Sequence, residues 1–227
     1  MTDDSRTHRR GFLAHLGEAE LSELRAVGRP QTFERGARLM SERQVGDRVM
    51  ALLSGRVKVI GVNDAGREAV FGFRSAGDLV GELSAIDGHP RSGNIEALER
   101  VETLTIAARD FLAHLERHPR VALVVMRLLC ERLRDADRKR VEYSTADTVG
   151  RVAARLLELG ERFGEAAPGG AVTIDLPLTQ EELAGWTGSS REAVARALQT
   201  MRELGWVHTA RRQITLYDEP ALRARAG

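Results

Sequence analysis

Apolar side chains recur at alternating steps of three and four residues along one long stretch, residues 119–143. Such a heptad seam follows one face of a helix, and Arg140 is a polar break in it. Pro119 suits the first turn of that helix, where its missing N–H has no partner anyway. A helix of about 25 residues spans roughly 37 Å, which is longer than one small domain needs. The seam consists of Met126, Leu129, Leu133, Ala136, Arg140 and Tyr143.

The long helix is either the core helix of a single monomeric domain or a dimerisation helix with one domain on each side. Before it, residues 31–106 alternate apolar and polar positions in short runs separated by turn residues. This pattern predicts about eight short antiparallel strands in a jelly roll or small barrel. Short helices are expected over residues 12–27 and 110–115, and a disordered arm over residues 1–10. The chain before the long helix is thus long enough for its own domain, which favours the dimerisation helix.

The helical seam is broken at residues 144–147, where we place a hinge. A second helix over residues 149–160, a loop over 164–170 and a strand over 172–176 follow. Two further short strands, joined by a turn within residues 207–217, predict a hairpin wing near the end of the sequence. The C-terminal part therefore predicts a second domain that mixes helices and strands.

Two short helices between the strand and the hairpin predict a helix-turn-helix. Thr179 begins the first, with Glu182 at the capping-box position, and Gly188 turns the chain after it. Ser189 is expected to cap the next helix, with Glu192 at its box position. A helix, a short turn that contains glycine and a second helix together form a motif used for DNA binding.

The outward face of the second of these helices carries side chains that suit DNA bases. Arg191 and Arg196 can each pair with O6 and N7 of guanine, and Glu192 can accept from the N4 amine of cytosine. The alternative is a solvated helix face, on which Glu192 and Arg196, four residues apart, form an ordinary ion pair. The charges alone favour that alternative, whereas the capped pair of helices and Arg211 in the wing favour DNA recognition.

A second group of chemically suggestive residues lies among the predicted strands. Gly81 would let a backbone N–H approach a ligand, and Arg91 with the Ser92 hydroxyl would bind a phosphate. Glu82 repels phosphate, so it would accept a ribose hydroxyl or orient Arg91. The alternative is a turn at a barrel corner with a Glu–Arg salt bridge, and the residues by themselves do not decide between the two.

The composition restricts the kinds of site that the chain can hold. The formal net charge is +1, so DNA binding must rest on local placement of charge. Cys130 is the single cysteine, which excludes a disulfide framework and a four-cysteine iron–sulfur site. Its position beside the seam predicts a small core residue. The six histidines form no motif, so we expect no metal site.

The sequence also argues against a membrane protein and an enzyme. No apolar run approaches the roughly 18 residues that a membrane span requires. Residues 1–10 are charged and lack the apolar core of a signal peptide, so we expect a cytoplasmic protein. No nucleophile–base pair and no glycine-rich nucleotide loop is recognisable, so we expect no catalytic residues.

Four motifs together resemble the Crp/Fnr family, the cyclic-AMP receptor protein type of bacterial regulator. Residues 33–36 and 53–59 are similar to strand motifs of that family. Residues 81–83, followed by Arg91 and Ser92, resemble its phosphate-binding cassette, and residues 190–196 resemble its recognition helix. The resemblance covers roughly residues 12–218.

The resemblance implies an α+β fold in three parts. Residues 1–118 would form a cyclic-nucleotide-binding β jelly roll that acts as a sensor. Residues 119–146 would form the dimerisation helix and the hinge. Residues 147–227 would form a winged helix-turn-helix that binds DNA.

The resemblance also implies a ligand and its contacts. The ligand would be a cyclic nucleotide, cyclic AMP or cyclic GMP, held inside the jelly roll. Its phosphate would lie on Leu83, Arg91 and Ser92, and its ribose on Gly81 and Glu82. The purine would lean on the long helix, at Arg132, Ala136 and Asp137.

A homodimer with its recognition helices about one DNA turn apart is implied as well. It would bind a palindrome with half-sites that resemble TGTGA, and it would activate or repress promoters, with RNA polymerase as a partner. The DNA contacts would come from Thr179, Gln180, Ser190, Arg191, Glu192, Arg196 and Arg211.

The chain departs from the family pattern at positions that select the base. A Thr-Ser pair that commonly meets adenine aligns with Ala136 and Asp137. Gly93 stands where alanine is usual, and Arg43 stands where glycine is usual. The ligand could thus differ from cyclic AMP, or the regulator could be independent of ligand, with the barrel as a structural or docking module. A third alternative, a regulatory subunit of a kinase or other enzyme, is opposed by the C-terminal third.

Overall fold

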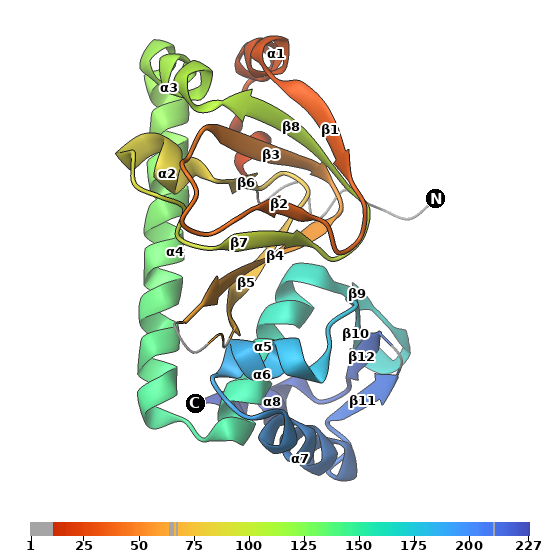
Figure 1. Cartoon of the computed structure of the whole chain (residues 1–227). Coiled ribbons are helices and arrows are strands. Elements are labelled where there is room, and N and C mark those ends of the chain that lie inside the picture. Colours follow the sequence, from red (N-terminus) through yellow and green to blue (C-terminus); the bar gives the residue numbers. More distant parts are fainter. Residues whose placement is uncertain (1–10, 64–65, 67, 211) are drawn as a thin grey trace. The chain divides into compact units, whose positions relative to one another are not determined.

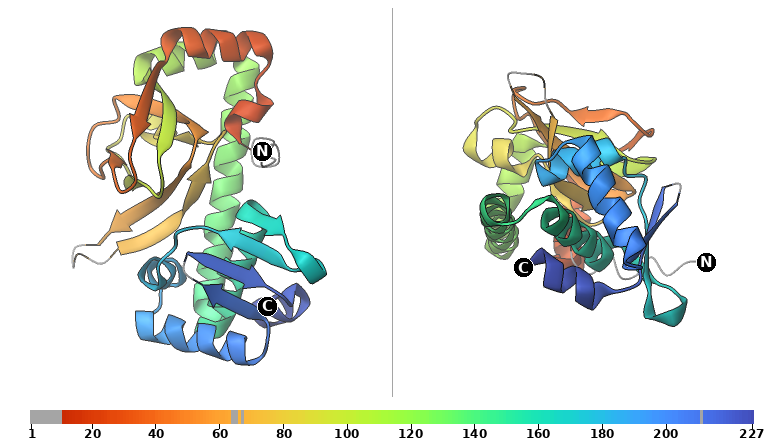
Figure 2. Two further views of the ribbon diagram at one scale, coloured as in Figure 1. Left: turned by 90° about the vertical axis from the view of Figure 1, so that its right-hand side faces the viewer. Right: turned by 90° about the horizontal axis from the view of Figure 1, so that it is seen from below.

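The computed structural model describes residues 11–63, 66, 68–210 and 212–227 (Figures 1 and 2). Among these residues the chain packs as two compact units, one built from the chain before residue 67 together with residues 71–134, the other from residues 68–70 and 135–227. The long helix thus contributes to both units. The domain boundaries expected after residues 118 and 146 stay a prediction, and the expected N-terminal arm lies outside the described residues.

Two four-stranded sheets lie in the first unit, apart from residues 68–70 at the start of β5, and they confirm the predicted N-terminal β domain. One sheet has the order β1 (Arg29–Phe33), β8 (Val101–Ala107), β3 (Arg48–Ser54) and β6 (Leu79–Val80). The other has the order β2 (Arg38–Met40), β7 (Asn94–Ala97), β4 (Arg56–Val62) and β5 (Glu68–Ser75).

Strand β3 is buried on both of its faces, because it lies between the second sheet and a layer of helices. Met50 and Leu52 join a core cluster with residues of β2, β4 and β7. Val49 and Ala51, on the opposite face, pack with residues of the surrounding helices. Successive side chains of a strand point to opposite faces, so β3 needs apolar residues at every one of these positions.

The helical layer of the first unit contains the short helices expected from the sequence and one that was not expected. A 3-10 turn, η1 (Phe12–His15), precedes α1 (Glu18–Val27), and α3 (Ala108–Arg117) precedes α4 (Pro119–Thr145), as Figure 1 shows. The unexpected helix, α2 (Glu82–Asp87), follows β6 directly. Buried residues of these helices form one cluster with β3 and β8, including Phe12, Leu24, Phe111, Val121 and Val125.

Helix α4 leaves a row of apolar residues exposed. Leu123, Met126, Cys130 and Leu133, here called the α4 stripe, all lie exposed within the described part of the chain, Met126 at 52% and Leu133 at 62%. The prediction that Cys130 is a core residue is therefore wrong. The reason is helical geometry, because Cys130 lies four residues after Met126 and three before Leu133, on a different face from Val121 and Val125. Leu129, also predicted in the seam, packs instead on the core.

The second unit begins with the last turns of α4 and continues through α5 (Thr148–Phe163). A four-stranded sheet follows, with the order β11 (Val207–Ala210), β12 (Gln213–Leu216), β10 (Val172–Asp175) and β9 (Gly164–Ala166). Helices α6 (Gln180–Thr187) and α7 (Arg191–Glu203) form the predicted helix-turn-helix, and α8 (Glu219–Ala226) ends the chain.

Several predictions for this unit need correction. The loop expected over residues 164–170 contains β9 and a 3-10 turn (Pro168–Gly170), because residues 164–166 pair with β10. Helix α8 was not predicted. The helix break expected at 144–147 is confirmed, since α4 ends at Thr145 and the Asp147 side chain caps α5 by accepting from the Gly150 N–H at 2.9 Å.

One aromatic cluster joins the end of α4 to α6 within the second unit. Trp186 is buried, and its ring lies 5.4 Å from the Nζ of Lys139 and 5.4 Å from the guanidinium carbon of Arg155. The hydroxyl of Tyr143 donates to the carbonyl of Trp186 at 2.8 Å. Lys139 over the indole and the Tyr143 hydrogen bond hold the last turns of α4 against α6, and Arg155 adds a contact from α5.

Candidate functional sites

The predicted phosphate site is built at the point where β6 ends and α2 begins. Gly81 caps α2 in the left-handed conformation, with a φ of 80°. A Cβ there would lie 2.6 Å from Nη1 of Arg91 and 2.7 Å from Cε of Met40. The left-handed backbone favours glycine, and the missing side chain lets the ends of Arg91 and Met40 approach the turn.

The guanidinium of Arg91 is a buried cation at this turn. Its Nη2 donates to the Arg48 carbonyl at 2.8 Å and lies 3.4 Å from Oδ1 of Asp47, whose side chain is 64% exposed. Its Nη1 lies 3.4 Å from the Gly81 carbonyl. Burial lowers the pKa of Arg91, and Asp47 partly offsets that effect, but an arginine stays protonated in a protein. The site therefore holds a positive charge that an exposed carboxylate only partly neutralises.

Glu82 is buried, and its partner is Arg132 of α4. Nη1 of Arg132 donates to Oε1 of Glu82, and Nη2 donates to the Leu79 carbonyl at 2.7 Å. The Glu–Arg salt bridge of the alternative interpretation thus exists, but it runs to α4 rather than to Arg91. The structure therefore brings Gly81, Glu82, Arg91 and Arg132 together as the resemblance implies.

The remaining predicted ligand residues are less closely gathered. Leu83 and Ser92 are exposed, each next to a buried residue of the cassette. Ala136 and Asp137 lie further along α4, in the second unit, where both are exposed and Asp137 lies 3.8 Å from Arg140. The contacts of Ala136 and Asp137 within the second unit do not show whether these residues contact a ligand. Their role stays a prediction.

An aromatic side chain that the sequence treated only as a strand residue lies beside the cassette. The ring of Phe71 is half exposed, and it occupies the space in which a Cβ of Gly61 would stand, 2.3 Å from its Cζ. A Cβ on Gly93 would lie 3.5 Å from the same ring and 2.8 Å from the Ile60 carbonyl oxygen. The glycine at position 93 is thus explained by the close approach of β4, and Phe71 is added to the candidate residues.

Arg43 is the other departure from the family pattern. Its backbone adopts a conformation that favours glycine, the usual residue at this position. Its φ is 66°, in the left-handed region that a side chain disfavours. Its N–H donates to the Arg91 carbonyl at 2.9 Å, and the Arg91 N–H donates to the Gln44 carbonyl at 2.9 Å. The strained turn therefore fixes the backbone of Arg91.

Substitution of Arg43 by glycine is expected to raise the free energy of unfolding by about 0.5 kcal/mol. A non-glycine residue in the left-handed conformation destabilises the folded state by roughly 1–2 kcal/mol, and glycine would remove that cost. Glycine also has more conformational freedom in the unfolded chain, which offsets part of the gain in stability. Urea denaturation measures the change. Arg35→Gly is the control, because Arg35 is exposed in a turn without a positive φ, and a comparable gain in that variant would contradict the explanation.

The helix-turn-helix is fixed by local caps and by one arginine from α5. The Thr179 hydroxyl accepts from the Glu182 N–H at 3.1 Å, and Gly188 adopts the left-handed conformation after α6. Arg151 donates to the Thr187 carbonyl at 2.8 Å and to the Ser189 hydroxyl at 3.1 Å. Arg151, which the sequence did not single out, therefore braces the turn between the two helices.

The N-terminus of α7 differs from the prediction by one residue. Ser190, not Ser189, is the cap, and its hydroxyl accepts from the Ala193 N–H at 3.2 Å. Glu192 therefore is not at the box position, because Ser189 is drawn toward Arg151 instead. The N–H of Glu192 itself, followed by the Ser190 hydroxyl, holds the pKa of the Glu192 carboxyl below its usual range.

The predicted DNA contacts form an exposed surface at the start of α6 and on the outer face of α7. Val194, Ala197, Leu198 and Met201 are buried, as expected for the inner face of α7. No ion pair joins Glu192 to Arg196 in the described part of the chain, and Arg211 lies outside it. The exposed members are Thr179, Gln180, Ser190, Arg191, Glu192 and Arg196.

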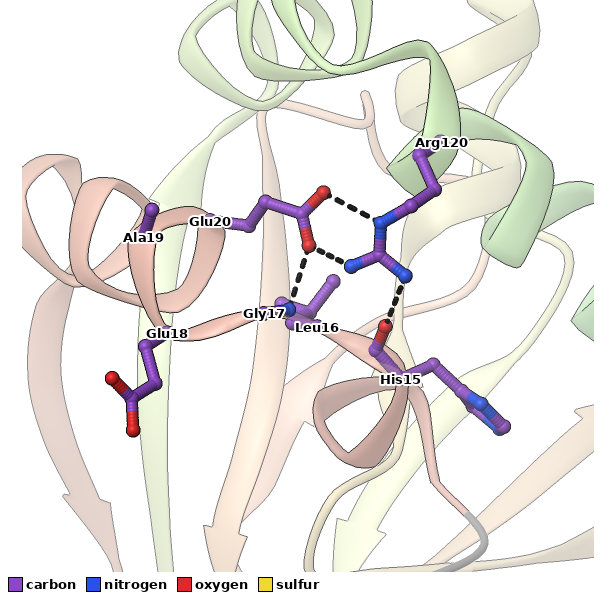
Figure 3. A pocket seen from close by; sticks show the side chains of 7 residues that line it. All are labelled: His15, Leu16, Gly17, Glu18, Ala19, Glu20 and Arg120. Carbon is purple, nitrogen blue, oxygen red and sulfur yellow. Dashed lines mark hydrogen bonds and ion pairs between the residues drawn. The ribbon is translucent and has the colours of Figure 1, made fainter.

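A separate hollow lies between α1 and the start of α4, shown in Figure 3. Arg120 crosses it, donating to both carboxylate oxygens of Glu20 and, at 2.9 Å, to the His15 carbonyl. The Gly17 N–H donates to the same carboxylate at 2.7 Å. These bonds pair Arg120 with Glu20 and tie α1 to α4. None of the predicted site residues lines the hollow.

Comparison with known proteins tests the family resemblance. A model of the Crp-like helix-turn-helix domain matches residues 150–225, and a model of the cyclic nucleotide-binding domain matches residues 30–118. The chain is 30% identical over 218 residues to the CRP-like cAMP-activated global transcriptional regulator of Mycobacterium tuberculosis, a match that covers 96% of this chain and 97% of that protein. The chain belongs to the Crp/Fnr family.

A further relative supports the same assignment, and a solved structure supports the fold. The Cyclic AMP receptor protein of Thermus thermophilus is 31% identical over 176 residues, which are 77% of each chain. The structure of FixK2 from Bradyrhizobium japonicum superposes with a TM-score of 0.78 at 21% identity, covering 88% of this chain and 98% of that one. This Crp/Fnr protein is therefore a DNA-binding transcription regulator and not an enzyme. None of its described helices combines the length and apolarity needed to cross a bilayer.

Proposed function

We propose that this Crp/Fnr protein is a homodimeric regulator whose affinity for DNA is set by a cyclic nucleotide bound in its N-terminal jelly roll. The observation that carries the proposal is the buried guanidinium of Arg91 beside the glycine turn at Gly81. The buried carboxylate nearby, Glu82, is paired with Arg132, and the direct partner of Arg91 is the exposed Asp47. A buried cation with so weak a direct partner is costly, and an anionic ligand would compensate for that cost. The relatives from Mycobacterium tuberculosis and Thermus thermophilus are both named for cyclic AMP.

In the proposed complex the cyclic phosphate replaces Asp47 as the partner of Arg91. The Asp47 contact is weak, at 3.4 Å, and its carboxylate is exposed, so little is lost when it turns into solvent. Ser92 adds a hydroxyl donor at the rim. A ribose hydroxyl then competes with Arg132 for Glu82, which couples the ligand to α4.

The base would lie against Phe71 on one side, because its half-exposed ring adjoins the cassette at Gly93. Aromatic rings stack on purines without selecting among them. Asp137 is the residue that we propose contacts the edge of the base, since its carboxylate can accept from an exocyclic amine. Both cyclic AMP and cyclic GMP carry such an amine, so we propose the class of ligand rather than one member.

The α4 stripe supports the proposed dimer. It presents Leu123, Met126, Cys130 and Leu133 at helical spacing, and a second copy of the same helix would bury these side chains across a two-fold axis. Two recognition helices would then meet half-sites about one turn of DNA apart. A palindrome of TGTGA-like half-sites, RNA polymerase as partner and a cytoplasmic location complete the proposal.

Calorimetric titration with cyclic AMP and cyclic GMP tests the proposed function, after sedimentation has established the dimer. We expect one nucleotide per protomer, and DNA affinity raised about 5- to 150-fold by the better ligand, which is the usual range of allosteric coupling. The control ligand is 5′-AMP, which lacks the cyclic phosphodiester. Specific DNA binding without heat from either cyclic nucleotide would contradict the sensor proposal.

The second candidate is a regulator of the same fold that is independent of ligand. One observation favours it. The two charged side chains that a nucleotide would use already have ion-pair partners, Arg91 with Asp47 and Glu82 with Arg132. In that case the jelly roll would act as a structural or docking module. A promoter footprint unchanged by either cyclic nucleotide is its expected signature.

A further inference from the structure

Three potential metal ligands meet where α1 packs against the junction of α3 and α4. Glu23 comes from α1, His114 from the last turn of α3, and His118 from the residue after α3. One ligand atom of each lies within 4.8 Å of those of the other two. The Nε2 of His118 and the Oε2 of Glu23 are 2.8 Å apart, and the two imidazole centroids are 4.5 Å apart.

The decisive member of this group is His114. Its side chain is fully buried, and neither ring nitrogen has a hydrogen-bond partner among the residues that the structure describes. Buried polar atoms are almost always satisfied, so two orphaned nitrogens on one ring require an explanation. Burial lowers the pKa of His114, ahead of any nearby charge.

We propose that Glu23, His114 and His118 form a binding site for a divalent transition-metal ion of the zinc type. Two imidazoles and one carboxylate are a ligand set that zinc uses, with a fourth position open to water. Tetrahedral bonds of about 2.0–2.1 Å place ligand atoms roughly 3.3 Å apart. Nε2 of His118 and Oε2 of Glu23 are already closer than that, and all three ligand atoms lie within 4.8 Å of one another, so a small adjustment is needed. Glu23, whose side chain is 43% exposed, can supply it.

The chemistry of the ligands selects against the common hard cations. Magnesium and calcium prefer oxygen ligands, whereas imidazole suits zinc and its neighbours in the first transition row. One group opposes any cation, since Nη1 of Arg117 lies 3.3 Å from the same Glu23 oxygen. The Arg117 side chain is 57% exposed and can turn into solvent when a metal binds.

A metal at this point would fix the start of the long helix. The His118 carbonyl accepts from the N–H groups of Val121 and Ala122, at 2.8 and 3.2 Å, and these bonds form the first turn of α4. An ion held by Glu23 and His118 would therefore tie α1 to the first turn of α4. The sequence led us to expect no metal site. The local signal for the proposed site is the spacing of His114 and His118, four residues apart, and its carboxylate comes from a distant part of the sequence.

The test uses the full chain without an affinity tag, stripped with a chelator and titrated with zinc chloride. We expect one zinc ion per chain, a visible absorption band for the cobalt(II) form typical of tetrahedral coordination, and no heat with magnesium. His114→Leu and Glu23→Gln should each weaken zinc binding at least about tenfold, since second-shell changes alone reach that size. Arg117→Gln should tighten it.

Two control variants remove other metal-binding groups that lie exposed. His89→Gln and Cys130→Ser should leave the zinc affinity unchanged. His114→Leu replaces an unsatisfied buried imidazole by an apolar group, so without metal it should melt no lower than the parent chain, while zinc raises Tm only in the parent. Failure to bind zinc, or an affinity that neither His114→Leu nor Glu23→Gln changes, would overturn the proposal. None of these readouts depends on cyclic nucleotide or DNA.

Discussion

We expect the substitution Arg91→Ala to abolish measurable binding of cyclic nucleotide. The variant removes the cation and the donors that the phosphate needs, and hydrogen bonds to charged groups contribute about 1.5–3 kcal/mol each. Two such bonds correspond to a loss of roughly a hundredfold or more in affinity. Calorimetric titration of the parent and variant chains measures the loss.

Two further variants make the Arg91 result specific. Arg48→Ala removes a neighbouring positive charge whose side chain is 41% exposed, and it should reduce affinity only slightly. Arg91→Lys keeps the charge but loses the planar fork, so its affinity should be intermediate. Because Arg91 is buried, thermal melting must show that each variant is folded. A folded Arg91→Ala variant with unchanged affinity would remove the residue from the proposed site.

Arg191→Ala should lose discrimination at a single guanine of the half-site, by about 1–3 kcal/mol. The side chain is exposed at the first position of α7, where recognition helices contact base edges. Competition binding at fixed salt, with half-sites altered one base pair at a time, measures the discrimination.

The matched control for Arg191 is Arg202→Ala on the same helix. Arg202 lies in the last turn of α7, where it donates to the Thr209 hydroxyl at 2.9 Å, so its loss should leave base discrimination intact. Equal weakening of all DNA sequences by Arg191→Ala would instead make Arg191 a phosphate contact, and the assignment to base readout would be wrong.

The helix-turn-helix was predictable because its signals are local. The Thr179 cap with Glu182 and the turn at Gly188 are short-range patterns, and the structure has them where the sequence places them. The cap of α7 was misplaced because Ser189 is drawn away by Arg151, a residue of another helix. Propensity rules contain no information on such a contact.

The candidate ligand site was predictable only in part, for the same reason. Residue types pointed to Gly81 and Arg91, and the resemblance added Arg132 near the base, but the ion pair of Arg132 with Glu82 was not predicted. Asp47 and Phe71 were missed because they reach the cassette from other strands, and nothing in their local sequence marks them. The exposure of Cys130 and the double burial of β3 likewise depend on which face of an element the rest of the fold covers.

The packing around Trp186 determines where the C-terminal part of this protein can be cut from the rest. A fragment that starts at Asp147 would lose Lys139 from one face of the indole and the Tyr143 hydroxyl from its carbonyl. It would also strip Glu142 from the buried side chain of Arg155. A fragment that starts at Asp135 retains all three contacts, so we expect a stable DNA-binding fragment to begin inside the long helix rather than after it.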